Sequence, residues 1–244
     1  MPNAIIYCAV LEDEILALNK VPASHLFPLE QGLHNTPPLL RERLQQTIDL
    51  IESTLHPEQI ILAYGLCSRG TEAIAARHAR LIIPRAHDCI TLLLGAKERY
   101  AQYVAQHPGT YWYSPGWNRH HVPPGKDRYD RLLAEYRAKF SAEDAEFLME
   151  TEQAWFNNYN LATYVDIGVT PIEHDLAYTQ ECATWLKWSF DHVRGDPQLL
   201  QDLLDGPWDD ARFLVLQPGE SLKMTADDQI ITRTTLTIEG RPPA

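Results

Sequence analysis

The chain has 244 residues, which suits one large domain or two small ones, and 45% of them are hydrophobic. Its 21 Lys and Arg against 33 Asp and Glu give a formal net charge of −12. This balance argues against a nucleic-acid partner, because neutralising phosphates requires clustered Lys and Arg. No apolar stretch reaches the roughly 20 residues of a membrane span, and no membrane partner is expected. The N-terminus lacks a signal-peptide pattern, so we expect a cytoplasmic protein.

The first 117 residues alternate between strand-like and helix-like segments. Continuous apolar runs predict strands that are buried on both faces, and periodic apolar residues predict amphipathic helices. Strands are predicted at 4–11, 59–64, 80–84 and 109–113, and helices at 36–57, 71–78 and 90–107. Thr36 and Asp88 are the predicted N-caps of the first and last of these helices. The alternation predicts an α/β fold with a mainly parallel sheet and helices on both faces.

A polar segment rich in Pro and Gly, residues 118–127, follows the fourth strand. Two helical segments after it predict a helical insertion in the middle of the chain. Beyond the insertion we expect a strand at 161–171, one helix over 174–195, a short helix, a strand at 212–216 and an antiparallel edge strand within 229–240. The prediction is a single α/β domain over 1–240, with two lobes, 1–117 and 118–240, as the alternative.

Reactive side chains follow two of the predicted strands. Cys67 stands in "GLCSRG" after the second strand, and His87, Asp88 and Cys89 stand in "RAHDC" after the third. Sites in parallel sheets form at the carboxyl ends of the strands, and sequential strands are usually neighbours. We therefore expect these two loops to face one crevice.

The residue types in these loops predict a metal site. Thiolate and imidazole suit Zn²⁺ and other borderline-soft metals, so Cys67, His87 and Cys89 are the predicted ligands. Three protein ligands with an open position is the pattern of catalytic zinc. The fourth ligand stays open among Cys8, His174, Cys182, a carboxylate, water and substrate. Asp88 is expected to support the ligands or to act as acid or base.

A metal-free reading uses the same loops. Cys67 or Cys89 would be a nucleophile, with His87 as base and Asp88 orienting it. Arg69 and Arg85 lie nearby in the sequence, which suits a substrate with a phosphate or carboxylate group and gives Arg85 a catalytic assignment.

Two glycines and a tryptophan are assigned to cofactor binding, with structural alternatives. Gly65 and Gly70 would let the backbone approach a ligand, or they serve tight turns. Trp117, after the turn "SPG", forms a pocket wall or plugs the end of the sheet. Cys8, inside an apolar strand, and Cys182, at helical spacing with apolar residues, are expected to be core residues.

Four motifs together resemble a known family. The segments "YGLCSRG", "IPRAHDCITLLLGAKERY", "GTYWYSPGW" and "DLLDGPWDDARFLVLQPGE" resemble the domain-of-unknown-function family numbered 1638. The similarity extends from the first strand to about Glu220. Members of that family often have Asn where this sequence has Arg69, which leaves Cys67, His87, Asp88 and Cys89 as the matching candidates.

The resemblance implies a soluble α/β protein of anaerobic or methyl-metabolising microbes, encountered beside corrinoid-dependent methyltransferase components. It implies no established reaction. Zinc enzymes that methylate thiols from a corrinoid protein use His-x-Cys followed by a later Cys, and His87, Cys89 and Cys182 are similar to that pattern.

Our hypothesis is a zinc-binding enzyme, of the transferase class, or an accessory protein of one-carbon metabolism, with a corrinoid protein or a small molecule as partner. The alternatives are a metal-free cysteine enzyme acting on an anionic small molecule and a non-catalytic cofactor-binding protein.

Overall fold

The computed structural model describes residues 3–235, and it divides the chain into two compact units. Unit 1 comprises Met1–Lys97 and Asp196–Ala244, and unit 2 comprises Glu98–Gly195. The division falls at these positions rather than after residue 117. The physical reason is strand pairing, because the strand at Thr110–Tyr113 pairs with Leu161–Asp166 in unit 2 and not with the sheet of unit 1.

Unit 1 is built on a five-stranded sheet, four strands of which are parallel. In spatial order the strands are β2 (Leu26–Leu29), β1 (Ala4–Cys8), β3 (Gln59–Ala63), β4 (Arg80–Pro84) and the antiparallel β8 (Phe213–Leu216). Nearly every residue of β1, β3 and β4 is buried. These continuous apolar runs therefore form the core strands that the sequence predicts, and the mainly parallel α/β fold is confirmed.

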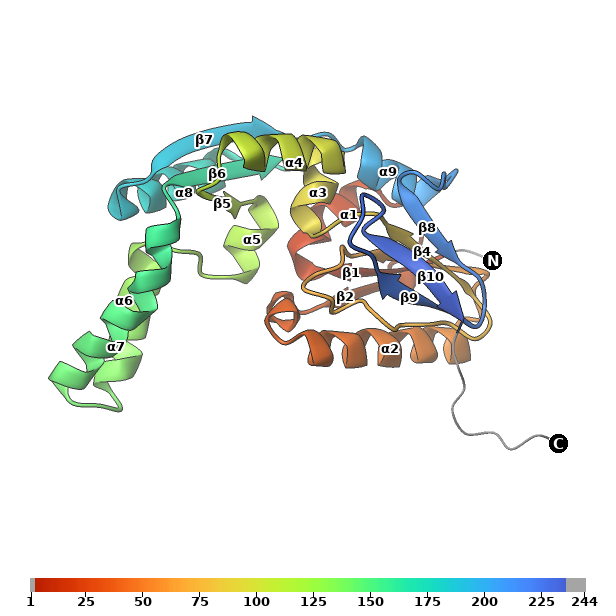
Figure 1. Ribbon diagram of the computed structural model, residues 1–244, viewed down its shortest axis with the longest axis horizontal. Helices are drawn as coiled ribbons and strands as arrows, with labels where there is room; N and C mark the ends of the chain where they lie inside the picture. Colours follow the sequence, from red (N-terminus) through yellow and green to blue (C-terminus); the bar gives the residue numbers. More distant parts are fainter. Residues whose placement is uncertain (1–2, 236–244) are drawn as a thin grey trace. The chain divides into compact units, whose positions relative to one another are not determined.

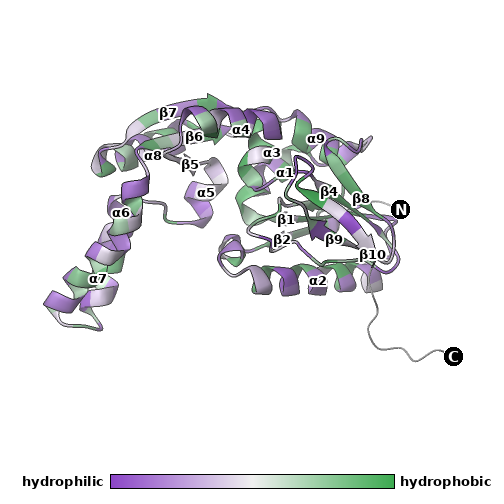
Figure 2. Cartoon of the chain, viewed as in Figure 1, coloured by the Kyte–Doolittle hydropathy of each residue, from purple (hydrophilic) through white to green (hydrophobic). Residues whose placement is uncertain are grey.

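Helices cover both faces of this sheet (Figure 1). The long helix α2 (Pro37–Thr54) runs along one face, and α1 (Glu12–Leu18) and α9 (Gln198–Asp205) lie on the other. The buried stripe of α2 consists of Leu40, Leu44, Ile48, Ile51 and Glu52. Figure 2 shows the alternation of hydrophobic and hydrophilic residues along α2 that this one-sided burial requires. Thr36 precedes α2 as predicted, but its side chain makes no capping hydrogen bond.

Short elements complete unit 1. They are the 3-10 helices η1 (Ala9–Leu11), η2 (Ala23–His25) and η3 (Gln31–Asn35), and an antiparallel pair formed by β9 (Glu220–Met224) and β10 (Ile231–Thr235). The expected antiparallel strand near the C-terminus is β10, although it pairs with β9 and not with the main sheet. Residues 236–240 of that prediction lie outside the described residues.

The helix predicted at 71–78 is absent from this described segment. Ala73 has a positive φ of 68°, and its backbone N–H bonds to the carbonyl of Leu222, while Ala75 forms an isolated antiparallel bridge with Ser221. These residues exchange backbone hydrogen bonds with a distant segment, so the tertiary pairing replaces the local helix that the alanines favour.

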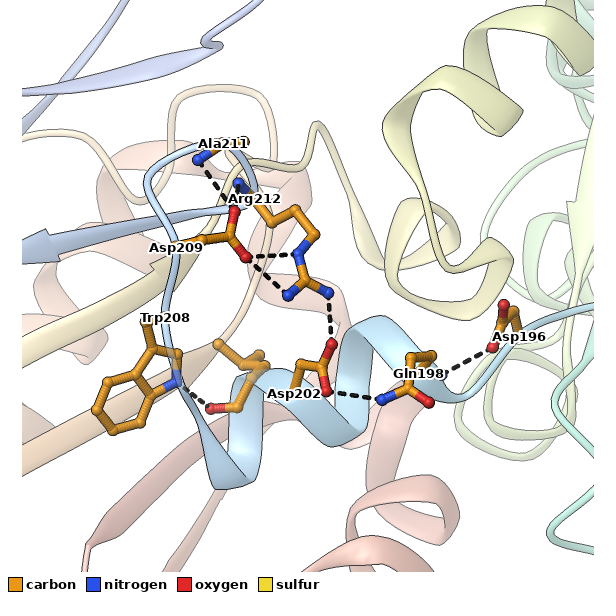
Figure 3. Close-up of polar contacts among 8 residues, drawn as sticks. Asp196, Gln198, Asp202, Trp208, Asp209, Ala211 and Arg212 are labelled. Carbon is orange, nitrogen blue, oxygen red and sulfur yellow. Dashed lines mark hydrogen bonds and ion pairs between the residues drawn. The ribbon is translucent and has the colours of Figure 1, made fainter.

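The segment between α9 and β8 is held by the polar contacts drawn in Figure 3. The Trp208 indole N–H donates to the Leu203 carbonyl at 2.9 Å, and the Arg212 guanidinium binds the carboxylates of Asp202 and Asp209. Asp209 also accepts the backbone N–H groups of Ala211 and Arg212. The motif "DGPWDDARF" thus positions the antiparallel strand β8 beside β4.

Unit 2 has its own three-stranded parallel sheet, β5 (Thr110–Tyr113), β6 (Leu161–Asp166) and β7 (Ser189–Arg194), in that order. Its helices are α4 (Lys97–Gln106), α5 (Pro115–His120), α6 (Lys126–Arg137), α7 (Ala142–Ala154), the 3-10 helix η4 (Trp155–Asn158) and α8 (Glu173–Leu186). Helices α6 and α7 are the helical insertion that the sequence predicts. Across both units, no helix of the described chain is long and apolar enough to cross a membrane.

Two predicted helices are each divided in the structure. The segment 90–107 forms α3 (Cys89–Leu94) and then α4, because Gly95 adopts a left-handed φ of 85° between them. The segment 174–195 forms α8 and then strand β7, because Lys187 adopts a left-handed φ of 60° at the end of α8. A left-handed residue ends a helix by satisfying its last carbonyls. The strand β7 is therefore an element that the sequence analysis missed.

Candidate functional site

The sheet of unit 1 has a topological switch point between β1 and β3. The chain leaves β1 toward β2 on one side, and it later crosses to β3 on the other side of β1. Loops that leave the carboxyl ends of two such strands in opposite directions open a crevice, where ligands of open α/β sheets bind. Cys8 is the last residue of β1, Cys67 follows β3, and Cys89 follows β4. Three of the four cysteines therefore lie around this end of the sheet.

The loops after β3 and β4 are joined by backbone hydrogen bonds. The N–H of Leu66 donates to the Ala86 carbonyl at 2.8 Å, and the N–H of Cys67 donates to the His87 carbonyl at 2.9 Å. A Cβ atom on Gly65 would lie 2.5 Å from the backbone nitrogen of Asp88, so only glycine fits there. The expectation that the two loops face each other agrees with these contacts.

The backbone at Cys67 is strained. Cys67, Ser68 and Arg69 have φ values of 45°, 56° and 70°, three consecutive left-handed residues without a glycine among them. Each such residue costs on the order of 1–3 kcal/mol and persists only where the surrounding structure imposes it. The pairing with the "RAHDC" loop and the turn that closes with Gly70 N–H on the Cys67 carbonyl, at 2.9 Å, hold it here.

The three thiols share one environment. All three are free; Cys8 is buried, and Cys67 and Cys89 are partly buried. Burial raises the pKa of Cys67, and the charges of Cys8 and Asp88 raise it further. Burial also raises the pKa of Cys89 well above its ordinary value, with further contributions from Asp88, Cys8 and Cys67. The thiols thus lie close enough to act on one another, and each resists ionisation in the absence of a cation.

One further side chain belongs to this thiol cluster and was not singled out from the sequence. Burial raises the pKa of the Tyr64 phenol well above its ordinary value, and the three thiols, Cys8 first, add to the shift. His34, in η3 after β2, lies within electrostatic reach of Asp88; burial lowers its pKa against the opposing effects of the Gln31 backbone and Asp88. Cys8, assigned to the core from its apolar strand, is part of the cluster.

The predicted ligand His87 is placed differently from the thiols. Its side chain is exposed, and its contribution to the loop is the backbone carbonyl that accepts from Cys67. Asp88 is the N-cap of α3, as predicted, accepting the Thr91 N–H at 3.2 Å, and its charge acts on the thiols.

The two arginines of these loops bind other partners than the thiols. Arg85 is buried and donates to the carbonyls of Asp210, Gln229 and Ile231, which anchors the C-terminal segment. Arg69 forms a two-pronged pair with Glu72 at 3.0 and 2.7 Å. Arg85 thus holds a distant segment, whereas Arg69 forms a local pair within its own turn.

The residues assigned to cofactor binding divide between the two units. Gly65 permits the close approach to Asp88, whereas a Cβ on Gly70 would meet the Leu40 side chain at 2.5 Å, so Gly70 serves packing against α2. Trp117 lies on α5 of unit 2, where its ring packs against His121 at 4.6 Å and against Tyr111 at 6.4 Å between centroids. Cys182 is buried in the core of unit 2, as expected for a core residue.

A preformed metal site brings several donors to one point. Within residues 3–235, no three or more His, Cys, Asp or Glu side chains are arranged to hold a metal ion. The three thiols lie near neighbouring strand ends, but they do not form such a preformed group. In unit 2, a surface cavity of about 360 Å³ is lined by Asn118, Arg119, His120, His121, Val122, Asp127, Arg131 and Tyr178.

The family model described as "Protein of unknown function (DUF1638)" matches residues 28–204. The chain belongs to this family. The DUF1638 match contains Cys67, Asp88 and Cys89, whereas Cys8 and the segment "GPWDDARF" lie outside it. No curated protein and no solved structure gives a significant match.

Proposed function

We propose that this DUF1638 protein binds a thiophilic metal ion, with zinc as the preferred metal, through Cys8, Cys67 and Cys89. We further propose that it takes part in methyl transfer in one-carbon metabolism, as an enzyme or an accessory protein. The observation that supports the metal site is that three free thiols follow three neighbouring strands around the switch point of the sheet and lie within electrostatic reach of one another. Soft thiolate ligands select zinc and similar metals over hard cations.

The surroundings of the thiols favour a metal over a metal-free nucleophile. A reactive cysteine needs positive charge nearby to stabilise its thiolate. Here burial and the Asp88 carboxylate raise the pKa of both Cys67 and Cys89, and Arg85 and Arg69 are engaged elsewhere. A bound cation reverses this balance, because metal coordination deprotonates a thiol outright.

Each residue near the thiols has a role in this proposal. Cys8, Cys67 and Cys89 are the ligands, which leaves one open position for a substrate thiol or water. The metal supplies the charge that keeps a substrate thiol ionised at neutral pH. Tyr64, pressed against Cys8, supplies a hydroxyl for one of the sulfurs, and His34 beside Asp88 supplies a neutral imidazole that receives the proton of an incoming thiol.

Metal content of the purified full chain tests the site. We expect close to one equivalent of zinc after expression with zinc, and a loss of most of it in Cys8→Ser, Cys67→Ser and Cys89→Ser. The matched control is Cys182→Ser, because Cys182 lies in the core of the other unit. Less than a tenth of an equivalent in the wild type would sink the proposal.

A pair of histidine variants separates the new ligand set from the predicted one. Because the His87 side chain is exposed and His34 is not a ligand in this proposal, both His87→Gln and His34→Gln should keep the metal. Loss of metal in His87→Gln alone would restore His87 as a ligand.

Alkylation rates test the metal-free alternative. With raised pKa values, the metal-free thiols should react with iodoacetamide slowly at pH 7 and faster as the pH rises. One thiol that reacts rapidly at pH 7 in the metal-free protein would favour the cysteine-enzyme reading instead.

The methyl-transfer part of the proposal rests on the four family motifs and needs its own test. Zinc-loaded protein, methylcobalamin and a small thiol should yield the thioether, with Cys67→Ser inactive. No product with a fully zinc-loaded protein would remove methyl transfer and leave the metal site standing.

A further inference from the structure

Unit 2 carries a second cluster of polar side chains, at the carboxyl ends of its own parallel strands. Asp166 is the last residue of β6, and Arg194 is the last residue of the neighbouring strand β7. One carboxylate oxygen of Asp166 lies 2.6 Å from Nη1 of Arg194, and the other lies 2.7 Å from Nε2 of His192. None of these three residues is used by the metal site in unit 1.

The strand register explains why these side chains meet. Asp166 pairs directly with Arg194, and residues 192 and 194 lie on the same face of β7 because side chains alternate along a strand. Asp191 lies on the other face, where its carboxylate accepts from the Tyr103 hydroxyl at 2.7 Å. The only carboxylate that Arg194 and His192 share among the described residues is therefore the buried one of Asp166.

The cluster is open toward solvent on its cationic side only. Asp166 has 1% of its side chain exposed, whereas Arg194 has 62% and His192 has 32%. A guanidinium has five N–H donors and an imidazole has two ring nitrogens. Among the side-chain nitrogens of Arg194 and His192, Nη1 and Nε2 are the ones that hydrogen-bond within the described chain. The buried carboxylate thus orients an exposed guanidinium and a partly exposed imidazole.

The loop after β6 fits closely around the guanidinium. Gly168 adopts a φ of 74°, and a Cβ atom built there would lie 1.6 Å from Nη2 of Arg194. The N–H of Gly195 also donates to the Asp166 carbonyl at 2.7 Å, which fixes the end of β7 against β6. Arg194 is therefore held between the loop and Asp166 instead of moving freely in solvent.

We propose that Asp166, His192 and Arg194 form a binding site for the oxyanion group, a carboxylate or a phosphate, of a small molecule. Arg194 contacts the anion with its outward N–H groups, a geometry that guanidinium groups use for planar oxyanions. His192 donates its Nδ1–H to the same ligand in the protonated form, because Nε2–H is given to Asp166 and only the imidazolium carries both N–H groups. Asp166 is a positioning residue that holds both. The location at the carboxyl ends of parallel strands is where such sheets bind ligands.

The test is an anion titration of the full chain, followed by calorimetry and by the ¹H–¹⁵N signals of the histidine rings, with His192 assigned from His192→Gln. Inorganic phosphate and malonate are the two probes, and chloride keeps the ionic strength constant. The variants are Arg194→Gln, Arg194→Lys and His192→Gln. The matched control is Arg137→Gln, an exposed arginine of the same unit that pairs with Glu146 at 3.6 Å.

We expect at least one probe to bind and to shift the His192 signals. Arg194→Gln should weaken binding by about 10- to 100-fold, as expected for the loss of a charge-assisted hydrogen bond. Arg194→Lys should keep part of the affinity, and Arg137→Gln should keep all of it. Tighter binding of phosphate assigns a phosphate ligand, and tighter binding of malonate assigns a carboxylate.

Two results would overturn the proposal. One is that the wild type and Arg194→Gln bind the anion probes with equal affinity, while Arg194→Gln has a lower thermal stability. The cluster would then be a purely structural ion pair. The other is a set of shifts confined to His120 and His121, which places the anion in the cavity beside α5 and α6. Both readouts are independent of the metal content of unit 1.

Discussion

At the scale of single residues, one buried carboxylate holds the chain in place before β4. Glu52, on the inner face of α2, accepts the backbone N–H groups of Arg77, His78 and Ala79 at 3.0, 2.6 and 2.8 Å. Burial raises its pKa, but the three N–H donors outweigh burial and bring the pKa below its ordinary value of 4.5. Three charge-assisted bonds to one side chain thus hold residues 77–79, which connect the segment paired with β9 to strand β4.

We predict that Glu52→Gln lowers the free energy of unfolding by about 1–3 kcal/mol at pH 7, because its amide N–H₂ group faces backbone donors. The lowered pKa means that ionised Glu52 stabilises the fold above pH 4.5 and that this contribution is lost as the pH falls toward the folded-state pKa. Urea unfolding between pH 7 and pH 3 measures both effects.

In Glu52→Gln, the decrease in unfolding free energy that accompanies protonation of Glu52 at low pH should be absent. Exposed Glu58, four residues after α2, provides the control variant Glu58→Gln, which should match the wild type throughout. Equal unfolding midpoints in the two variants at pH 7 would contradict the role given to Glu52.

At the same scale, the sequence identified Cys67, Asp88 and Cys89, offered Cys8 only as one of several fourth ligands, and missed Tyr64 and His34. Cys8 reads as core because its neighbours are apolar, and only its position at the end of β1 places it beside the other thiols. A strand-end position was a usable signal, since "AIIYC" ends at that cysteine. For His34 no local pattern exists, because Asp88 approaches it from a loop about 50 residues away in sequence.

At the scale of elements, the two loops of the thiol cluster depend on each other for their conformation. Gly65→Ala places a methyl group 2.5 Å from the Asp88 nitrogen, where backbone must move. We predict a loss of about 1–3 kcal/mol in unfolding free energy, as for other overpacked sites, and a weaker zinc affinity. Thermal unfolding and a competitive zinc-chelator titration measure these two quantities.

Gly32→Ala is the matched control for Gly65→Ala, because a Cβ at Gly32 meets no atom within 4 Å. If Gly65→Ala bound zinc as tightly as Gly32→Ala, the pairing of the two loops would have no part in forming the metal site.

The elements that the sequence predicted correctly are those whose hydrophobic pattern directly indicates which residues are buried. The apolar strands β1, β3 and β4 and the striped helix α2 are of this kind. Strand β7 was missed because its exposed edge pattern, "SFDHVR", continues the helical spacing of α8, and the break depends on a left-handed Lys187 that no turn residue marks.

At the scale of the whole molecule, unit 2 is one continuous segment inserted into unit 1. We predict that residues 98–195 fold when expressed alone, because their sheet and the buried core around Tyr113, Tyr164 and Cys182 come from this segment only. Circular dichroism and a cooperative thermal transition provide the measurement.

Residues 1–97 alone are the comparison. They lack β8, which covers the edge of β4, and the carbonyls that accept from Arg85, so they should aggregate or remain unfolded. A fragment 98–195 without a cooperative transition would show that its core depends on the rest of the chain.

The sequence by itself determined the α/β class, the parallel core strands, the helical insertion, the family motifs and two of the three clustered thiols. These features are readable because buried elements have a periodic hydrophobic pattern and turns have a characteristic local composition. The tertiary structure decided the rest. It placed β5 in a second sheet, brought Cys8 and His34 to the loops of Cys67 and Cys89, turned Arg85 into an anchor, and set Asp166 opposite Arg194. These outcomes depend on strand order and register, which arise from contacts between residues far apart in the chain and leave no local pattern.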